Sequence, residues 1–543
     1  MARHWIDEIA DKLYEALTRR GKEVYVFNGG LSISGLQHIG RLRGEIIYGE
    51  VLRRILSERG LKIKQYITLY TMDEWKGKEE QLRAFPNSEE AVKYAGWPLY
   101  RVPDPMGCHK SWIEHYWEDF GPYLKEFTDG EITPIPTHEL YRSKLREFTK
   151  LTFKLREKVI ETLNKYRGTK VKPDWIPFQP ICGKCGRINS TETIEVIDED
   201  RVRYRCRHCG YEGIAELSEG KLPWRIEWVG VWWALGVDFE PYGKDHATPG
   251  GSRDSCSDLA KNVYGFEPPE GFPFEWVSLR IGGEDKDMTS SGFIGITPKQ
   301  WLEIAHPHIY RFLVLKTPPM KKIVIDPVAI PHYYNQYFRA ERIYYGVEEP
   351  RNDDEKVLLS RSYELSYPHG KPPETMPEQV SYTHLAILSQ VVPRNLWEKE
   401  GIRRLKISGL LPEEPTPYGL KRVLEMIEKA YNWVQKYAPS DYRVELLPEP
   451  TKEIIESIPL EHREILLKMG SMLEKLEEWN EENIKNTMID ATKDLDPKER
   501  KRFYESFYKL FLGKPSGPRA APLLAVLGKE ESLRYFKALK EYQ

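Results

Sequence analysis

The chain has 543 residues, which is too long for one hydrophobic core and predicts about three or four domains. Lys and Arg number 81 against 83 Asp and Glu, a formal net charge of -2. That balance excludes a uniformly basic nucleic-acid-binding protein but leaves enough charge for local patches. Acidic residues interrupt any signal-peptide pattern near the start, and no run of about 18 apolar residues follows. We expect a cytoplasmic protein without a membrane anchor.

The first predicted unit is a strand followed by a helix. The apolar stretch 24–27 predicts a buried parallel strand, and apolar residues at helical spacing from Ile39 to Leu56 predict a helix behind it. The loop between them is rich in small residues and ends in His38-Ile39-Gly40. At such a junction, free backbone N–H groups and the positive end of the helix stabilise a phosphate. We expect His38 to add a donor and Gly40 to allow close approach of a nucleotide; alternatively, a lone histidine is structural.

A second strand is predicted at 62–71, and Asp73 follows it. A carboxylate at this end of a strand faces the ligand crevice of an open α/β sheet, although a helix N-cap is an equally good interpretation of Asp73. From 77 to 222 the alternation of strands and helices is lost, apart from an amphipathic helix near 144–166. This segment is predicted to be an insertion between two halves of a doubly wound domain.

Four of the six cysteines form two Cys-x-x-Cys pairs, at Cys182 and Cys185 and at Cys206 and Cys209. Two such pairs are typical of a zinc ribbon, here at about 178–215. Four thiolates leave no open coordination position, so the zinc is expected to be structural. Two disulfides are the alternative, which an intracellular compartment disfavours. Cys108 and Cys256 stand apart, and we expect them to be unligated.

The sheet is expected to resume near 224–228 and to end at Gly243-Lys244-Asp245-His246, a second edge of the same pocket. Ser252 is expected to cap a helix at 254–263. A strand at 274–279 then leads into a loop of small and charged residues at 282–292, for which a solvated turn is the default interpretation.

Helices dominate beyond about 298, including predicted helices at 418–437, 458–485 and 498–511 and a last helix after a Gly/Pro loop. The predicted fold is therefore α/β: a Rossmann-type doubly wound parallel sheet with a zinc-ribbon-containing insertion, followed by an α-helical C-terminal domain. The predicted boundaries are 1–76 and 223–297 for the two halves of the α/β domain, 77–222 for the insertion, 298–343 for a linker region, and 344–543 for the helical domain.

Several motifs resemble one enzyme family. Ser34-Gly35-Leu36-Gln37-His38-Ile39-Gly40-Arg41 resembles the first signature of class I aminoacyl-tRNA synthetases, with Arg41 in place of the usual His or Asn. The segments 102–109, 114–115 and 236–246 are most similar to the class I lysyl-tRNA synthetases. The loop 286–292 stands where the second signature, Lys-Met-Ser-x-Ser-Lys-Gly, is expected. Asp287 is interposed in that motif, and Gly292 replaces its second lysine.

The resemblance implies a lysine–tRNA ligase of protein biosynthesis, which uses ATP to convert L-lysine to lysyl-adenylate and then transfers it to the 3' end of tRNA(Lys). It further implies Mg2+ with the ATP, a monomer, and a helical domain that binds the anticodon. The implied catalytic residues are His38 and Lys286. The implied ATP-binding residues are Ser34, Gly35, His38, Gly40, Arg41, Asp245, Lys286, Met288, Ser290 and Ser291. The implied lysine-binding residues are Gly30, Ser32, Asp73, Trp228 and His246, with Asp73, Glu227 and Trp228 as alternatives for the ammonium contact.

Two alternatives remain open. A glutamyl or glutaminyl synthetase shares this fold but needs a cation for the substrate carboxylate, whereas the acidic and aromatic residues near the pocket favour lysine. The missing second lysine instead favours a synthetase-like tRNA-binding protein with impaired catalysis. On the helical domain, Trp433, Tyr437 and Tyr442 lie near basic residues and are candidates for stacking on anticodon bases, although a place in the helix core is the commoner fate of such aromatics.

Overall fold

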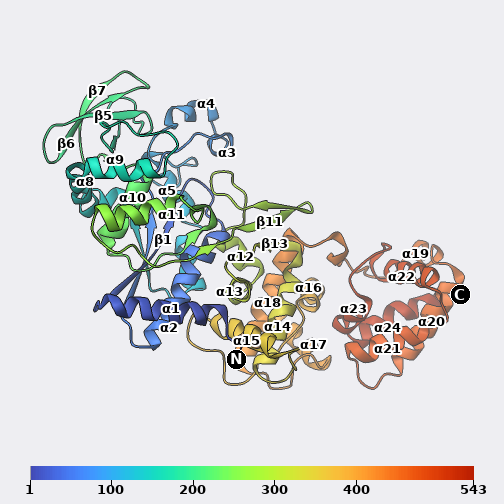
Figure 1. The fold of residues 1–543 in the computed structure, drawn as a ribbon. Helices are drawn as coiled ribbons and strands as arrows, with labels where there is room; N and C mark the ends of the chain where they lie inside the picture. Colours follow the sequence, from blue (N-terminus) through green and yellow to red (C-terminus); the bar gives the residue numbers. More distant parts are fainter. Residues whose placement is uncertain (1, 543) are drawn as a thin grey trace. The chain divides into compact units, whose positions relative to one another are not determined.

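The computed structural model describes residues 2–542 (Figure 1). The chain forms two compact units. Unit 1 comprises the residues up to Trp301 with Tyr310–Asp326 and Pro350–Lys371, and unit 2 comprises Leu302–Ile309, Pro327–Glu349 and the chain from Pro372 onward. Within the described part of the chain, no helix is both long and apolar enough to cross a membrane.

The centre of unit 1 is a parallel sheet. β1 (Tyr25–Leu31) pairs with β2 (Ile63–Leu69), and β2 pairs with β3 (Ile132–Pro136). On the other side of β1, parallel bridges link Phe27 to Phe239 and Phe239 to Glu270, in the segments that lead into the paired strands β9 (Tyr242–Gly243) and β10 (Pro273–Phe274). The resulting order, β3-β2-β1-β9-β10, is that of a doubly wound sheet. The predicted fold class is confirmed.

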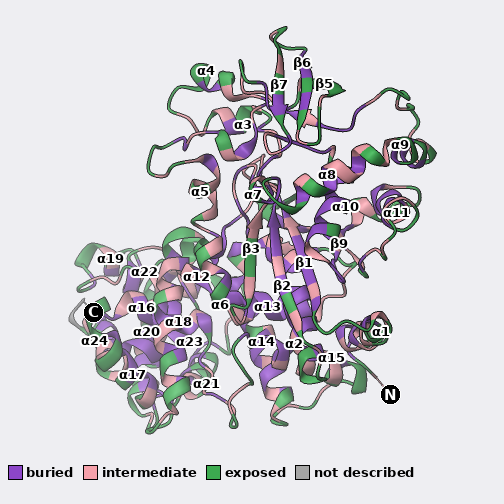
Figure 2. Ribbon diagram, turned by 90° about the vertical axis from the view of Figure 1, so that its left-hand side faces the viewer, coloured by how far each residue is buried: buried purple, intermediate pink, exposed green. Residues whose placement is uncertain are grey.

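The third strand lies inside the segment 77–222, which the sequence pattern assigned entirely to an insertion. β3 has the sequence Ile-Thr-Pro-Ile-Pro and no fully buried residue. Proline is confined to edge strands because it cannot donate a ladder hydrogen bond, and the two prolines hid this strand from a periodicity argument. Figure 2 shows the contrast between β3 and the largely buried β1 and β2.

The strand expected near 224–228 is wrong: Trp224–Leu235 is the helix α10, which ends at Gly236 with a φ of 63°. The helix is apolar on nearly all sides because it is buried, and a short apolar run has no period that separates a strand from a helix. The single helix expected at 144–166 is two helices, α8 (Lys144–Lys154) and α9 (Arg156–Lys165).

The expected loop at 282–292 contains a strand. β12 (Glu284–Asp287) pairs antiparallel with β11 (Val277–Ile281), and β11 pairs in parallel with β13 (Ile323–Ile325). Gly282 and Gly283, both with positive φ, form the turn between β11 and β12. The small sheet thus carries the residues that follow it, 288–292, to a fixed place.

The cysteine pairs lie at a small antiparallel sheet of β5 (Thr191–Val196), β6 (Arg201–Cys206) and β7 (Glu212–Glu216). Cys206 ends β6, Cys209 lies between β6 and β7, and Cys182 and Cys185 precede β5. The short strands β4 (Gln179–Pro180) and β8 (Gly220–Lys221) pair beside it. The remaining helices of unit 1 are short or flank the sheet: α1 (Trp5–Arg20), α2 (Gly49–Glu58), α3 (Glu79–Leu82), α4 (Ser88–Ala91), α5 (Trp112–Trp117), α6 (Leu124–Phe127), α7 (Thr137–Leu140), α11 (Ser252–Asp258), α13 (Pro307–Lys316, of which 310–316 belong to this unit) and α15 (Asp353–Leu365). The helix α12 (Pro298–Ile304) begins in unit 1 and ends in unit 2.

Unit 2 is helical. Its helices are α14 (Ile330–Tyr344), α16 (Tyr382–Val391), α17 (Ile402–Ile407), α18 (Pro417–Lys436), α19 (Lys452–Glu456), α20 (Leu460–Glu474), α21 (Glu481–Ala491), α22 (Pro497–Leu512), α23 (Ala520–Leu527) and α24 (Lys529–Ala538). The single helix expected at 458–485 is divided into α20 and α21, where Asn480 caps a new helix by accepting from the amide of Asn483. Trp433 is buried and donates to the carbonyl of Pro327, so it belongs to the core.

Candidate active site

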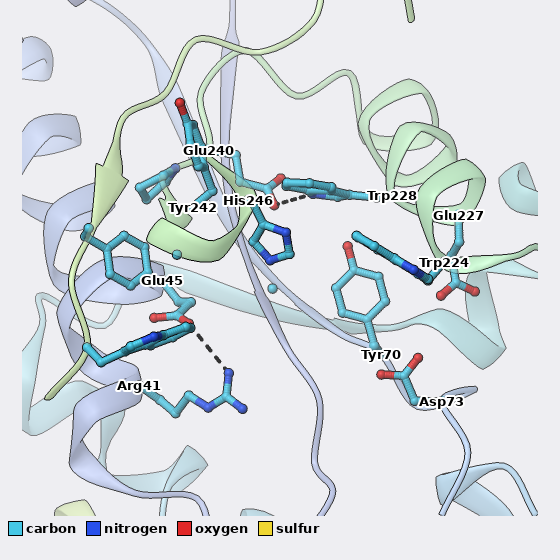
Figure 3. A pocket seen from close by; sticks show the side chains of 15 residues that line it. Arg41, Glu45, Tyr70, Asp73, Trp224, Glu227, Trp228, Glu240, Tyr242 and His246 are labelled. Atoms are coloured by element: carbon cyan, nitrogen blue, oxygen red, sulfur yellow. Dashed lines mark hydrogen bonds and ion pairs between the residues drawn. The ribbon is translucent and has the colours of Figure 1, made fainter. Parts of the chain in front are cut away.

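Two neighbouring cavities lie at the carboxyl ends of the parallel strands in unit 1. The first, of about 210 Å³, is acidic and aromatic and is drawn in Figure 3; it is lined by Gly30, Arg41, Glu45, Tyr70, Asp73, Trp224, Glu227, Trp228, Glu240, Pro241, Tyr242, Gly243, His246, Phe274 and Trp276. The second, of about 360 Å³, is lined by Ser34, His38, Gly40, Arg41, Glu45, Asp245, Phe274, Glu275, Trp276, Val277, Asp287, Met288, Thr289, Ser290 and Ser291. Because Arg41, Glu45, Phe274 and Trp276 line both cavities, the two open onto a common wall.

Most of the expected site residues come together here. The expected lysine-binding residues Gly30, Asp73, Trp228 and His246 line the first cavity. The second cavity contains the expected ATP-binding residues except Gly35 and Lys286. Ser32 lines a third opening, which it shares with Asp73.

Gly35 and Lys286 stand apart from the cavity walls for different reasons. A Cβ atom on Gly35 would lie 2.5 Å from the carbonyl oxygen of Ser290, so glycine allows the two loops to touch. Lys286 lies in β12 opposite Leu279 and is exposed. Its neighbour Asp287 accepts from Ser278 and forms an ion pair with Lys322, at 2.6 Å in both cases.

His38 begins the first helical turn after β1. It is 6% exposed, and its Nδ1 atom is buried and has no hydrogen-bond partner within residues 2–542. Burial lowers the pKa of His38 well below its usual value, and the nearby Arg41 lowers it further. The imidazole ring of His38 is therefore neutral near pH 7. A neutral ring still has one N–H group, so it can donate a hydrogen bond without taking up a further proton.

Arg41 and Glu45 stand at the junction of the two cavities. Nη1 of Arg41 lies 3.6 Å from Oε1 of Glu45, while Oε2 of Glu45 is buried and has no hydrogen-bond partner among the described residues. Burial raises the pKa of Glu45 to about 7, although Arg41 opposes the rise. One carboxyl oxygen of Glu45 therefore has no partner in the described part of the chain, and because its pKa is near 7, an approaching cation would favour loss of the carboxyl proton. Glu45 was not predicted as a site residue because it lies one turn beyond the signature.

Glu240 is held by three donors at the roof of the first cavity. Its carboxylate accepts from Asn28 at 2.9 Å, from Trp228 at 2.8 Å and from Trp232 at 3.1 Å. The guanidinium of Arg253 lies 4.6 Å from the ring centroid of Tyr242, which lines the same cavity. Glu240 was not predicted, and only its contacts with the buried aromatic residues reveal it.

At the opposite end, two carboxyl groups share one internal lysine. Nζ of Lys221 lies 2.8 Å from Oδ1 of Asp73 and 3.0 Å from Oε1 of Glu227, and Tyr141 donates to the other oxygen of Glu227 at 2.5 Å. Burial raises the pKa of Glu227, and Lys221 opposes the rise. The N-cap interpretation of Asp73 is not what the structure shows, since its recorded partner is the side chain of Lys221.

His246 lines the first cavity beside two indoles. Its ring centroid lies 5.0 Å from that of Trp228 and 5.8 Å from that of Trp224. Its Nδ1 atom lies 2.8 Å from the hydroxyl of Ser252, the residue expected to cap a helix. Ser252 instead begins α11 and forms no cap hydrogen bond. Its role in the structure is to fix the ring of His246.

The loop 288–292 is held on both sides. The amides and carbonyls of Thr289 and Ile294 bond reciprocally, at 2.9 and 3.1 Å. The next residue, Phe293, has a φ of 54°, in the left-handed region that side chains seldom adopt. Nζ of Lys78 donates to the hydroxyl of Ser291 at 2.9 Å. The ammonium group of Lys78 therefore contacts the loop beside Gly292, although Lys78 lies far outside the second signature.

The four cysteines of the two pairs form a compact cluster. The Sγ atoms of Cys182 and Cys209 are 3.6 Å apart, and those of Cys185 and Cys206 are 3.7 Å apart. Zinc–sulfur bonds of about 2.3 Å in a tetrahedron place ligand sulfurs about 3.8 Å apart, so the residues fit zinc. The expected zinc-binding group is formed, whereas Cys256 is buried and is not part of it. A second group, Asp104, Cys108, His109 and His115, also has metal-binding geometry.

Comparisons with known proteins identify one family and several relatives along nearly the whole chain. The family described as tRNA synthetases class I (K) matches residues 3–369, and an anticodon binding domain matches residues 419–538. A protein of Aeropyrum pernix named Lysine--tRNA ligase is 52% identical over 97% of this chain and 96% of its own length. Proteins of the same name from Pyrococcus horikoshii and Methanosphaera stadtmanae are 34% and 30% identical, over 97% and 99% of this chain and 98% and 99% of their own lengths.

Proposed function

This chain belongs to the family of class I tRNA synthetases (K), and from that membership we propose that it is a lysine–tRNA ligase: it activates L-lysine with ATP and transfers the lysyl group to tRNA(Lys). The observation that carries the proposal is the pair of adjoining cavities, one acidic and aromatic and the other lined by the first signature and the loop 288–292. The reacting carboxylate and the α-phosphate of ATP meet where the cavities join.

We assign the lysine substrate to the first cavity. Its α-ammonium lies at Glu45, the acid nearest the junction, and its carboxylate faces the second cavity. The aliphatic stem runs along Tyr70 and Trp228. The ε-ammonium reaches Asp73, because two carboxyl groups that share the single ammonium of Lys221 retain capacity for a second cation.

ATP and its Mg2+ occupy the second cavity in this proposal. Adenylation needs little side-chain acid–base chemistry, because the carboxylate attacks the α-phosphate and pyrophosphate leaves. His38 donates to the phosphate as a neutral imidazole, and Arg41 balances the growing negative charge. Mg2+ would supply charge neutralisation on the phosphates.

We assign to Lys78 the role of the missing second lysine of the signature, which is to stabilise the charge of the triphosphate. Gly292 has no side chain, and Lys286, on β12, is exposed and does not line the second cavity, whereas Nζ of Lys78 donates to Ser291 on the cavity wall. A short movement of this flexible side chain brings its charge to the departing pyrophosphate. The proposal thus accounts for activity without an intact second signature.

The activity is tested by lysine-dependent exchange of labelled pyrophosphate into ATP, in the presence and absence of tRNA. Lysine-dependent exchange, followed by formation of lysyl-tRNA, is the expected result. Exchange with glutamate or glutamine instead would support the alternative synthetases, against which the acid-lined cavity argues. No exchange together with intact tRNA binding would identify a non-catalytic tRNA-binding protein.

The remaining assignments are part of the same proposal. Unit 2, which contains the matched anticodon binding domain, binds the anticodon end of the tRNA. The cysteine cluster holds a structural zinc, the protein acts as a monomer, and it works in the cytoplasm, where translation takes place. Metal analysis and sedimentation of the purified protein test the first two.

A further inference from the structure

The end of the first cavity at Asp73 combines aromatic rings with acids. Tyr70, Trp224 and Trp228 line the cavity together with Asp73 and Glu227. Figure 3 shows Tyr70, Trp224, Asp73 and Glu227 gathered on one side of it. The indoles of Trp224 and Trp228 are nearly parallel, at 26°, with ring centroids 6.3 Å apart. A cation bound at Asp73 therefore lies among aromatic faces, which attract positive charge.

The chain positions these rings and already uses two of them to hold cations. A Cβ atom on Gly30 would lie 2.7 Å from Cε2 of Tyr70, so glycine in β1 lets the ring of Tyr70 lie against the strand. The guanidinium of Arg225 lies 5.6 Å from the ring centroid of Trp224. That of Arg253 lies 5.7 Å from the ring centroid of Trp228. The same kind of contact is available to the cation of a ligand.

The cavity does not close beyond Asp73. Asp73 and Trp224 also line the third opening, which has a volume of about 510 Å³. The side chain of Asp73 is 31% exposed, and its Oδ1 atom lies 2.8 Å from Nζ of Lys221. A substituent on an ammonium group that binds Asp73 can therefore extend into the third opening.

Few acceptors face an ammonium group at this place. Both oxygens of Glu227 are engaged, one with Lys221 and the other with the hydroxyl of Tyr141. Oδ2 of Asp73 has no hydrogen-bond partner among residues 2–542. An unmodified ammonium has three N–H donors, and a site selective for it would offer an acceptor to each. Here one carboxylate oxygen and the aromatic rings take that place.

We propose that the first cavity also accepts lysine methylated on Nε, so that this chain activates Nε-monomethyl-lysine and Nε,Nε-dimethyl-lysine as well as lysine. The inference rests on the proposed function and on the assignment of the ε-ammonium to Asp73. Each methyl group removes one donor but keeps the positive charge, and methylated ammonium groups bind well in aromatic surroundings. One N–H remains for Oδ2 of Asp73 even in the dimethylated side chain.

The chemical step is the same for all these substrates. A carboxylate oxygen of the amino acid forms a bond to the α-phosphorus of ATP, the bond to the β-phosphate breaks, and pyrophosphate leaves. The ε-nitrogen takes no part in this exchange of bonds. One additional methyl group changes recognition in an apolar pocket only modestly, so selection against it is weak.

Pyrophosphate exchange with four amino acids tests the proposal in the full-length protein. We expect kcat/KM for monomethyl-lysine within about tenfold of that for lysine, and for dimethyl-lysine within about 100-fold. Nε-acetyl-lysine carries a substituent of similar size but no charge, and is expected to fall at least about 1000-fold below lysine. Exchange with lysine and with neither methylated form would overturn the proposal. Equal use of acetyl- and dimethyl-lysine would contradict recognition of the cation.

The product identifies the substrate that was used. Mass spectrometry of the amino acid released from tRNA(Lys) after incubation with monomethyl-lysine distinguishes the methylated residue from traces of lysine. The methylated mass is the expected result. Release of lysine alone would show that a contaminant caused the exchange, and would overturn the proposal.

Variants of Trp224 test the aromatic contact. Trp224→Leu is expected to lower kcat/KM for dimethyl-lysine about tenfold more than that for lysine, because dimethyl-lysine has fewer hydrogen bonds and depends more on the ring. Trp224→Phe, which keeps an aromatic face, should retain a ratio near that of the wild type. Asp73→Asn should lower both values, since both substrates are cations. Equal losses for the two substrates in Trp224→Leu would contradict the aromatic contact.

Calorimetric binding separates this inference from the proposed function, because it does not require catalysis. Lysine and dimethyl-lysine are expected to bind the full-length protein, and acetyl-lysine is not. Binding of both without lysine-dependent exchange would overturn the proposed function and leave the cavity's selectivity as inferred. Lysine binding and exchange without binding of either methylated form would do the reverse.

Discussion

At the residue scale, burial decides the chemistry of the site more than residue type does. His38 is neutral because it is buried beside Arg41, and Glu45 keeps its proton to about pH 7 because its carboxyl group has lost solvent. Lys221 already satisfies part of the charge on Asp73 and Glu227. In the proposed function, these three environments make His38 a hydrogen-bond donor to phosphate, Glu45 an acceptor for a cation, and the Asp73–Lys221–Glu227 group a wall with partly balanced charge.

His38→Ala is expected to lower the rate of lysine-dependent pyrophosphate exchange by about 100-fold, because the lost donor acts on charge that develops in the transition state. The KM for lysine should change little, since His38 does not line the first cavity. Steady-state exchange kinetics with a thermal melt measure both. Wild-type kinetics in a normally folded variant would show that His38 is structural.

The affinity for lysine is expected to depend on the ionisation of Glu45. The pKa of Glu45 in the free protein is raised to about 7, so the acceptor is mostly protonated below that pH. Lysine binding must then displace a proton, and kcat/KM for lysine should fall about tenfold per pH unit below 7 and level off above it. Glu45→Gln should bind lysine weakly and lose this step. A pH profile that is identical in both proteins would remove Glu45 from the binding site.

Lys78→Met is expected to reduce pyrophosphate exchange by about 100-fold while leaving the affinity for lysine intact, because the lost charge acts on the pyrophosphate group. Lys62→Met, which removes a charge just before β2, is the matched control and should be silent. Equal activity of the two variants would mean that another group neutralises the leaving pyrophosphate.

At the scale of elements, the strands set the positions of the site and the irregular segments supply its residues. β1 delivers Gly30 to the first cavity, β10 delivers Phe274 to the wall between the cavities, and β11–β12 carry the loop 288–292. α10 presents Glu227 and Trp228 from the helix face rather than from a strand end. The prediction that Glu227 and Trp228 lie at the pocket was therefore correct, although they lie on a helix and not on the expected strand.

Removal of zinc from the four-cysteine cluster is expected to loosen β5–β7 selectively. The metal replaces the large apolar core that so small a sheet lacks. Hydrogen exchange of Cys182→Ser should show rapid exchange across residues 191–216, while β1 and β2 remain protected. Unchanged protection of the small sheet would show that its packing alone maintains it.

At the scale of the whole molecule, the two units do not follow one another along the chain. α15 lies beyond the predicted start of the helical domain, yet it belongs to unit 1. There the fully buried Arg311 donates to the carbonyls of Leu365 and Ser366 at the end of α15, and pairs with Glu50 at 2.8 Å. A boundary near 344 would therefore cut through the catalytic unit.

A chain ended after Glu341 is expected to unfold more easily than one ended after Lys371. The shorter chain loses α15 and with it two hydrogen bonds to a buried guanidinium, each worth about 1.5–3 kcal/mol. The longer chain keeps them, and both lack the same anticodon binding domain. Denaturant midpoints measure the difference, and equal midpoints would mean that α15 contributes nothing to unit 1.

The sequence by itself determined the features that depend on local spacing. His38 and Gly40 after an apolar strand, four cysteines in two pairs, and the helical pattern of the C-terminal part each point to their structure because neighbours in sequence are neighbours in space. The strand expected at 224–228 was wrong because a short, mostly buried apolar run has no polar face from which a period can be read.

Only the tertiary structure decided which charges meet. Lys221 contacts Asp73, which is 148 positions away in the sequence, and Lys78 contacts Ser291, which is 213 positions away. Glu240 accepts hydrogen bonds from one residue of β1 and two of α10. Interactions between such distant residues depend on how the sheet brings strand ends together, and no local pattern encodes that arrangement. The same holds for Glu45, whose pKa is set by desolvation, a property of everything packed around it.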